Sequence, residues 1–215
     1  LTFSGRIGGT GLLNLTVGST TQGGAAKFTD ANAQVADNIT IIGGDHADED
    51  SAVTFKDAIT ATAIVLDDNL GTATINIDAA NGTQNIAGTI NGVSDYDGTV
   101  NVSDSGSGES DMITFQGIIG ASKDLGALNV GTTALGGDVT LDLATSIQTV
   151  TVQGGDGATE NAGLVATGAV TYEALNIKGG THADGDALVT LNGAGTQALG
   201  AATLNSDDGD ATLEV

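Results

Sequence analysis

The sequence predicts an all-β protein, a right-handed parallel β-helix (β-solenoid) built from coils of about 25 residues each. Three observations support this fold: a strand-forming composition, short apolar segments that recur at a fixed interval, and acidic, glycine-rich segments between them. The 215 residues include 34 Gly and no Pro. The apolar residues are mainly Val, Ile, Leu and Ala beside abundant Thr, which is typical of strands. Long amphipathic helices are not expected, because residues that fill helix surfaces are scarce.

The period appears in two series of short apolar segments. Most steps in both series are about 25 residues, the length of one coil with three short strands, in which each coil pairs only with its neighbours. The first series is Leu15, Ile41, Ile77, Val102, Val130, Val152, Ile177 and Leu204, and the second is Phe3, Phe28, Phe55, Ile90, Phe115, Leu141, Val165, Val189 and Leu213.

Both series slip by about ten residues at the same place, between Phe55 and Ile90. We expect one insertion near residues 67–85 to explain both slips. Residues 1–215 are otherwise interpreted as a single continuous β-repeat array. Because the sequence starts and ends in strand-like residues, we expect it to be a segment of a longer chain.

The alternative fold is an antiparallel β-sandwich, in which strands also recur at short, regular intervals. A sandwich does not explain why the same residues return in the same places, as in NITIIGGDHADEDSAVTFKDA and LNIKGGTHADGDALVTLNGA. In the solenoid, we expect the four phenylalanines, Phe3, Phe28, Phe55 and Phe115, to point into the core.

The charge of the chain limits its partners. Its 27 acidic and 5 basic residues give a formal net charge of -22. Nucleic acid and anionic membranes are not expected as partners, because phosphate binding needs clustered Lys and Arg. No run of about 18 apolar residues is present, so we expect no direct membrane insertion.

The acidic segments are the strongest chemical signal. Alternating Asp and Gly supplies carboxylate and carbonyl oxygens on a backbone that can curl around a calcium ion. Stacked on successive coils along one edge, such corners repel one another unless cations settle among them. The alternative is a solvated acidic edge that keeps the protein soluble. The candidate calcium ligands are Asp45, Asp48, Asp50, Asp104, Glu109, Asp111, Asp156, Asp184, Asp186, Asp207, Asp208 and Asp210.

His46 and His182 occupy equivalent positions in two of these segments, each followed by Ala-Asp. They lie several coils apart, so one metal ion cannot use both. We therefore interpret them as solvated turn residues and expect no transition-metal site.

Several segments resemble the repeats of large bacterial surface proteins. The segments VTFKDAI, ITFQGIIGASKDLGALNV and DVTLDLATSIQTVTVQGGDGA are similar to repeats of filamentous-haemagglutinin-like adhesins, autotransporter passengers and surface-layer proteins. The resemblance covers most of the chain. It implies a secreted structural polymer or adhesin at the bacterial cell surface, and it carries over no catalytic residue.

The expected function is that of an extracellular structural protein, a self-assembling surface-layer or filament subunit. An adhesin stalk or binding module, with a cell-surface glycan as partner, is the alternative. A β-helix polysaccharide-active enzyme is a more remote alternative, because Lys178 is the only basic residue beside an acidic segment and the carboxylates follow the repeat. We expect no enzymatic activity.

Overall fold

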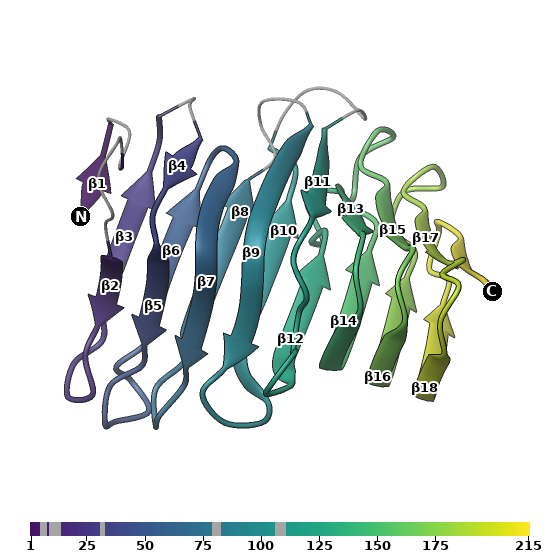
Figure 1. Cartoon of the computed structure of the whole chain (residues 1–215). Helices are drawn as coiled ribbons and strands as arrows, with labels where there is room; N and C mark the ends of the chain where they lie inside the picture. The colour runs from purple at the N-terminus through teal and green to yellow at the C-terminus, as the bar shows by residue number, and fades with distance from the viewer. Residues whose placement is uncertain (5–7, 9–13, 31–32, 79–82, 106–110) are drawn as a thin grey trace.

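The computed structural model describes the whole chain except residues 5–7, 9–13, 31–32, 79–82 and 106–110. The described secondary structure is entirely β, in two long parallel sheets that are wound coil upon coil (Figure 1). None of the described residues form a helix with the length and apolar character needed to cross a bilayer.

Sheet 1 contains one strand from each successive coil. Its nine strands, in spatial order, are β1 (Thr2–Phe3), β3 (Ala25–Phe28), β6 (Ser51–Phe55), β8 (Ala73–Asp78), β10 (Asp97–Ser103), β12 (Leu125–Val130), β14 (Thr145–Gln153), β16 (Val170–Lys178) and β18 (Gln197–Asn205).

Sheet 2 contains the strands that alternate with those of sheet 1 along the chain. Its ten strands, in spatial order, are β19 (Ala211–Glu214), β17 (Ala187–Leu191), β15 (Ala162–Ala166), β13 (Gly137–Leu141), β11 (Met112–Phe115), β9 (Gln84–Gly92), β7 (Ile59–Asp67), β5 (Asn38–Ile42) and β2 (Asn14–Gly18), with β4 (Gln34–Val35) paired to β7.

The predicted β-solenoid is confirmed. Every pairing between the named strands is parallel, and the coils repeat about every 25 residues over about eight turns. In Figure 1 the strands β5, β7 and β9 lie toward the viewer and run downward, whereas β6, β8 and β10 lie behind and run upward. Because the chain advances to the right at the same time, the coil is right-handed. The alternative of an antiparallel sandwich is therefore wrong.

The register explains the slip in the two series of apolar segments. On sheet 1, Phe55 pairs with Ile77 and Ile77 pairs with Val102, with no extra residues between these coils. Ile41, which precedes Ile77 in the first series, belongs to β5 on sheet 2. Each series therefore changes sheet at the slip. The insertion expected near residues 67–85 is corrected to a change of sheet, and β8 is an ordinary strand within that range.

A third line of pairing accounts for the expected third strand of each coil. Ile64 of β7 pairs with Ile90 of β9, and Ile90 bridges to Ile119. Ile119 bridges to Thr145 of β14. The line starts on sheet 2 and continues on strands that belong to sheet 1. The chain therefore passes through this third line without a corner, as part of sheet 2 in the early coils and as part of sheet 1 in the later coils.

The core lies between the sheets and is formed by alternate residues of each strand. Phe28, Phe55 and Phe115 are at most 1% exposed, and Phe3, on the first strand of sheet 1, is 38% exposed. The rings of Phe3 and Phe28 stack with centroids 4.9 Å apart, and those of Phe28 and Phe55 stack at 5.1 Å. The inward orientation expected for the phenylalanines is confirmed for Phe28, Phe55 and Phe115, and Phe3 continues the stack at its exposed end.

Candidate functional site

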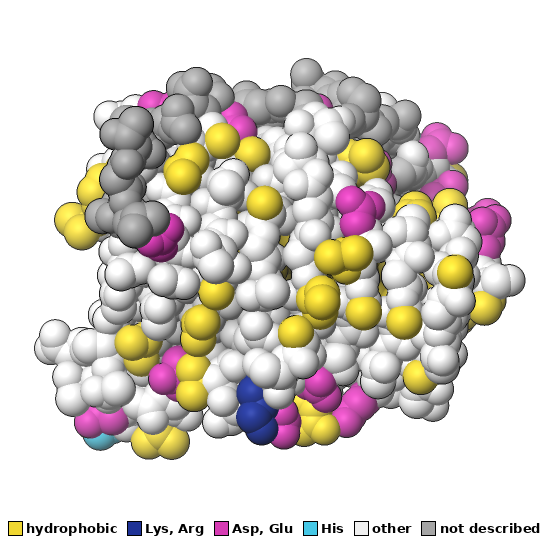
Figure 2. Space-filling view, viewed as in Figure 1, with side chains coloured by type: hydrophobic (Ala, Val, Ile, Leu, Met, Phe, Trp, Pro, Cys, Tyr) yellow, Lys and Arg dark blue, Asp and Glu magenta, His cyan; other side chains and the backbone are white. Residues whose placement is uncertain are grey.

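The acidic segments form turns between the sheets, but not along one edge. The turn at residues 43–50 leads from β5 on sheet 2 to β6 on sheet 1, whereas the turns at 154–161, 179–186 and 206–210 lead from sheet 1 to sheet 2. Figure 2 shows acidic side chains along the lower margin, from the lower left to the centre, and again at the upper right. The prediction of a single acidic edge is therefore wrong. The change of sheet described above moves the turns from one edge to the other.

The turns on the two edges nevertheless share one backbone conformation. The Gly44 amide donates to the Glu49 carbonyl at 2.8 Å, and the Gly180 amide donates to the Gly185 carbonyl at 2.6 Å. The carbonyl of the histidine closes the turn in both, since His46 accepts from Glu49 at 3.0 Å and His182 accepts from Gly185 at 2.9 Å. His46 and His182 are equivalent within their turns but lie on different edges of the solenoid.

Glycine is required at the start of these turns by close contact between coils. A Cβ atom on Gly180 would lie 1.9 Å from the Gly155 carbonyl oxygen of the neighbouring turn. Real Cβ atoms do not approach backbone oxygen so closely, so Gly180 lets the two turns stack.

Two of the candidate calcium ligands accept hydrogen bonds from the next coil through their carboxylates, Asp50 on one edge and Asp186 on the other. Asp50 accepts from the Thr72 amide at 2.9 Å and from its hydroxyl at 2.8 Å. On the other edge, Asp186 accepts from the Asp210 amide at 2.9 Å, and Asn161 accepts from the Asp186 amide at 2.8 Å. These side chains satisfy backbone N–H groups that lie where the ladders end. Hydrogen bonds from Thr72 hold the pKa of Asp50 below its ordinary value.

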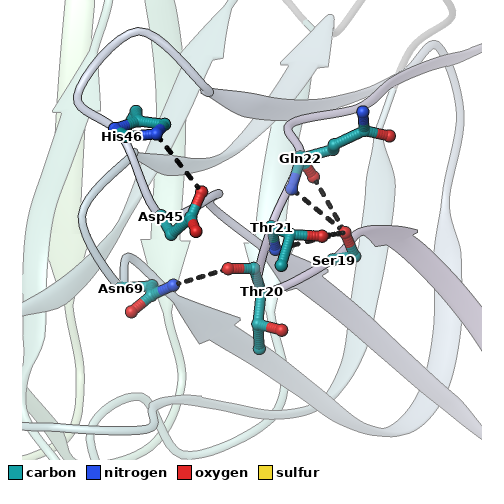
Figure 3. Close-up of polar contacts among 7 residues, drawn as sticks. All are labelled: Ser19, Thr20, Thr21, Gln22, Asp45, His46 and Asn69. Atoms are coloured by element: carbon teal, nitrogen blue, oxygen red, sulfur yellow. Dashed lines mark hydrogen bonds and ion pairs between the residues drawn. The ribbon is translucent and has the colours of Figure 1, made fainter.

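Each histidine has a carboxylate of its own turn nearby, and His182 Nδ1 also accepts a hydrogen bond from the Asp184 amide at 3.1 Å. His46 Nε2 lies 3.9 Å from Asp45 Oδ1, and His182 Nδ1 lies 3.8 Å from Asp184 Oδ2. Figure 3 shows that the His46 contact lies beside the neighbouring turns, where the Asn69 amide donates to the Thr20 carbonyl at 3.2 Å.

The remaining candidate ligands are dispersed. Asp104 is 9% exposed, Asp111 is half-buried, and Glu109 lies outside the described residues. Within the described parts of the chain, no three His, Asp or Glu side chains come together in a group that could hold a metal ion. Asp45, Asp48, Asp156, Asp184, Asp207 and Asp208 are exposed in their turns.

Two polar contacts were not predicted from the sequence. Lys56 Nζ lies 3.0 Å from Asp78 Oδ2, and Ser105 donates to the same carboxylate from its amide at 3.2 Å and from its hydroxyl. Partial burial acts to raise the pKa of Asp78, but the bonds from Ser105 and Lys56 outweigh it and lower the pKa. The partners lie about one coil apart in sequence, so only the coil register brings them together.

The second contact spans several coils. The Tyr96 hydroxyl donates to Glu173 Oε1 at 2.6 Å, although the two residues are 77 positions apart. Tyr96 also has a positive φ of 75°, which is uncommon for a residue with a side chain. No repeat in the sequence signals this pair.

Comparisons with known proteins give no identification. No protein-family model, no curated protein and no solved structure matches the chain.

Proposed function

We propose that the chain is an extracellular structural protein at the bacterial cell surface, a self-assembling subunit of a surface layer or filament. One observation supports this proposal above the others. Two carboxylates of the acidic turns, Asp50 and Asp186, bond to the adjacent coil and so help to hold the stack together. Part of the acidic set that stands out in the sequence therefore strengthens the stack of coils.

The net charge limits which surfaces of two copies of the chain can contact each other. A chain with a formal net charge of -22 repels its own copies at low salt. The two acidic edges carry much of this charge, so contacts between copies are expected on the sheet faces or through cations at the edges. Calcium, with exposed carboxylates such as Asp45 and Asp184 among its ligands, is part of the proposal.

The test is the assembly state of the purified chain. Sedimentation velocity and negative-stain imaging with and without calcium should show filaments or sheets whose amount increases with protein concentration. The alternative function, an adhesin stalk, requires separate rods instead. Eight intervals of about 4.8 Å make the body of one chain roughly 38 Å long. Monomeric rods under all conditions would reject self-assembly and favour the stalk.

A further inference from the structure

A shallow groove runs over the outer face of sheet 1, beside the turns that lead to sheet 2. Its volume is about 640 Å³, and its lining extends over six neighbouring strands from β6 to β16. Five strand intervals of about 4.8 Å make the groove roughly 24 Å long. One column of the floor consists of Thr54, Asn76, Asn101, Asn129 and Thr151, one residue per coil. The groove therefore repeats its chemistry along the solenoid axis.

The asparagines of this floor leave some of their hydrogen-bond donors and acceptors unused within the protein. The Asn101 side-chain amide donates to Asn76 Oδ1 at 2.9 Å and accepts from the Asn129 amide at 2.9 Å. A primary amide offers two N–H groups and two lone pairs. Asn101 therefore keeps one donor and one acceptor for a molecule in the groove.

Five other polar side chains of the groove have no partner among the described residues. Thr54, Ser103, Thr151, Gln153 and Lys178 make no side-chain hydrogen bond or ion pair with any other residue that the structure describes. They contrast with Asp50 and Asp186, whose carboxylates bond to the next coil. Unused donors and acceptors are therefore gathered in the groove.

The charge of the groove differs from that of the chain. Among the described residues that line it, the one carboxylate, Asp78, forms an ion pair with Lys56 at 3.0 Å, and the other charged residue is Lys178. The net charge of -22 repels a polyanion as it approaches. An uncharged molecule rich in hydroxyl groups meets no such barrier, and it can both donate to and accept from amides and hydroxyls.

We propose that this groove binds an uncharged linear polysaccharide, aligned with the solenoid axis. The length and one-residue-per-coil repeat of the floor suit a chain of successive sugar rings. None of the described residues that line the groove is aromatic, so binding depends on hydrogen bonds that replace those made by water. Affinity is therefore low for a short oligosaccharide and rises with chain length, because each added sugar meets a further coil. This proposal does not depend on self-assembly.

The test is native affinity electrophoresis of the whole chain in gels that contain mixed-linkage β-glucan, dextran or sodium polygalacturonate. We expect at least one neutral polysaccharide to slow the protein. The double variant Thr151→Val, Gln153→Leu and the single variant Lys178→Ala should each weaken this retardation at least fivefold. The matched controls, Thr40→Val on sheet 2 and Lys123→Ala at another turn, should behave like the unmodified chain. Thermal melting checks that each variant is folded, and Lys178→Ala changes only an exposed side chain.

Three outcomes would overturn the proposal. The first is that neither neutral polysaccharide slows the unmodified chain. The second is that folded groove variants and controls are slowed equally, which would place binding elsewhere. The third is retardation by polygalacturonate alone, which would assign the groove or another surface to an anionic ligand.

Discussion

The turn at residues 43–50 and the turn at 179–186 have the same backbone hydrogen bonds but lie on opposite edges of the solenoid. The first leads to sheet 1 and the second leads to sheet 2. Their shared conformation follows from a local pattern of paired glycines and acidic residues. Their different positions follow from the strands on either side. A repeated motif therefore predicts the shape of a turn and leaves its place in the coil undetermined.

The largest expected effect tests whether the core differs between the early and the late coils. Phe55 lies in the early coils and Phe115 in the later ones, and both are at most 1% exposed. We expect Phe55→Ala and Phe115→Ala each to lower the free energy of unfolding by roughly 3 to 5 kcal/mol, because each leaves a cavity. Urea unfolding followed by circular dichroism measures the loss.

The control for the core variants is Tyr96→Ala. Tyr96 is 42% exposed and contributes a surface contact to Glu173, so its loss should cost much less. Equal, small losses at Phe115 and Tyr96 would contradict the inward packing of Phe115. A large loss at Phe55 alone would show that the aromatic stack makes the early coils the more stable half.

A second prediction compares two glycines in stacked turns of the same edge. In Gly180→Ala the new methyl group meets the backbone carbonyl of Gly155, so we expect a loss of about 1 to 3 kcal/mol. In Gly157→Ala it meets the Glu160 Cγ atom at 2.8 Å, which a side-chain rotation can relieve. Gly157 also closes its turn at the position that His46 occupies on the other edge. Melting temperatures that fall equally in both variants would show that the contact between turns does not require glycine.

Much of the fold could be predicted because each repeat of the sequence corresponds to one coil of the structure. A residue type that recurs at the same position of every coil pairs with the equivalent residue of the next coil. This pairing gives parallel strands and an inward stack of phenylalanines. The sheet to which each segment belongs could not be predicted in the same way. The segments around Ile41 and Ile77 look alike in sequence but lie on different sheets.

The candidate site was predicted less well, for a similar reason. The acidic turns were found from composition, but the role of Asp50 and Asp186 depends on backbone amides one coil away. The Lys56–Asp78 pair and the Asn101 ladder also need the register between coils. The sequence does not give that register, because coil lengths vary around the mean.

A third prediction concerns calcium at the two edges. A ligand that binds only the folded state at ten times its dissociation constant stabilises the protein by about 1.4 kcal/mol. We expect the melting temperature to rise more in calcium than in magnesium or sodium at matched ionic strength, because magnesium holds its water and fits flexible Asp-Gly loops poorly. Asp45→Asn and Asp184→Asn would then show which edge binds calcium. Equal increases in all three salts would reduce both edges to solvated acidic surfaces.

The smallest expected effect is the acid sensitivity of each edge. Asp50 and Asp78 both have a lowered pKa in the folded state, Asp50 through bonds from Thr72 and Asp78 through bonds from Ser105 and Lys56 that outweigh burial. A lowered pKa means that the unfolded chain binds the proton more tightly. The stability from these carboxylates is therefore present above the unfolded pKa, near pH 4, and is lost as the pH falls through the folded pKa.

Asp50→Asn and Asp78→Asn should therefore each flatten the fall in stability below about pH 4, and both should lower stability at pH 7. Asp78→Asn is expected to have the larger effect, because its carboxylate is partly buried and forms an ion pair with Lys56. Asp45→Asn is the control, since Asp45 is exposed and makes only a long contact with His46. Urea unfolding between pH 2 and pH 7 measures all three. If Asp45→Asn flattens the curve as much as Asp78→Asn, acid unfolding reflects the total charge of the chain and not the bonds between coils.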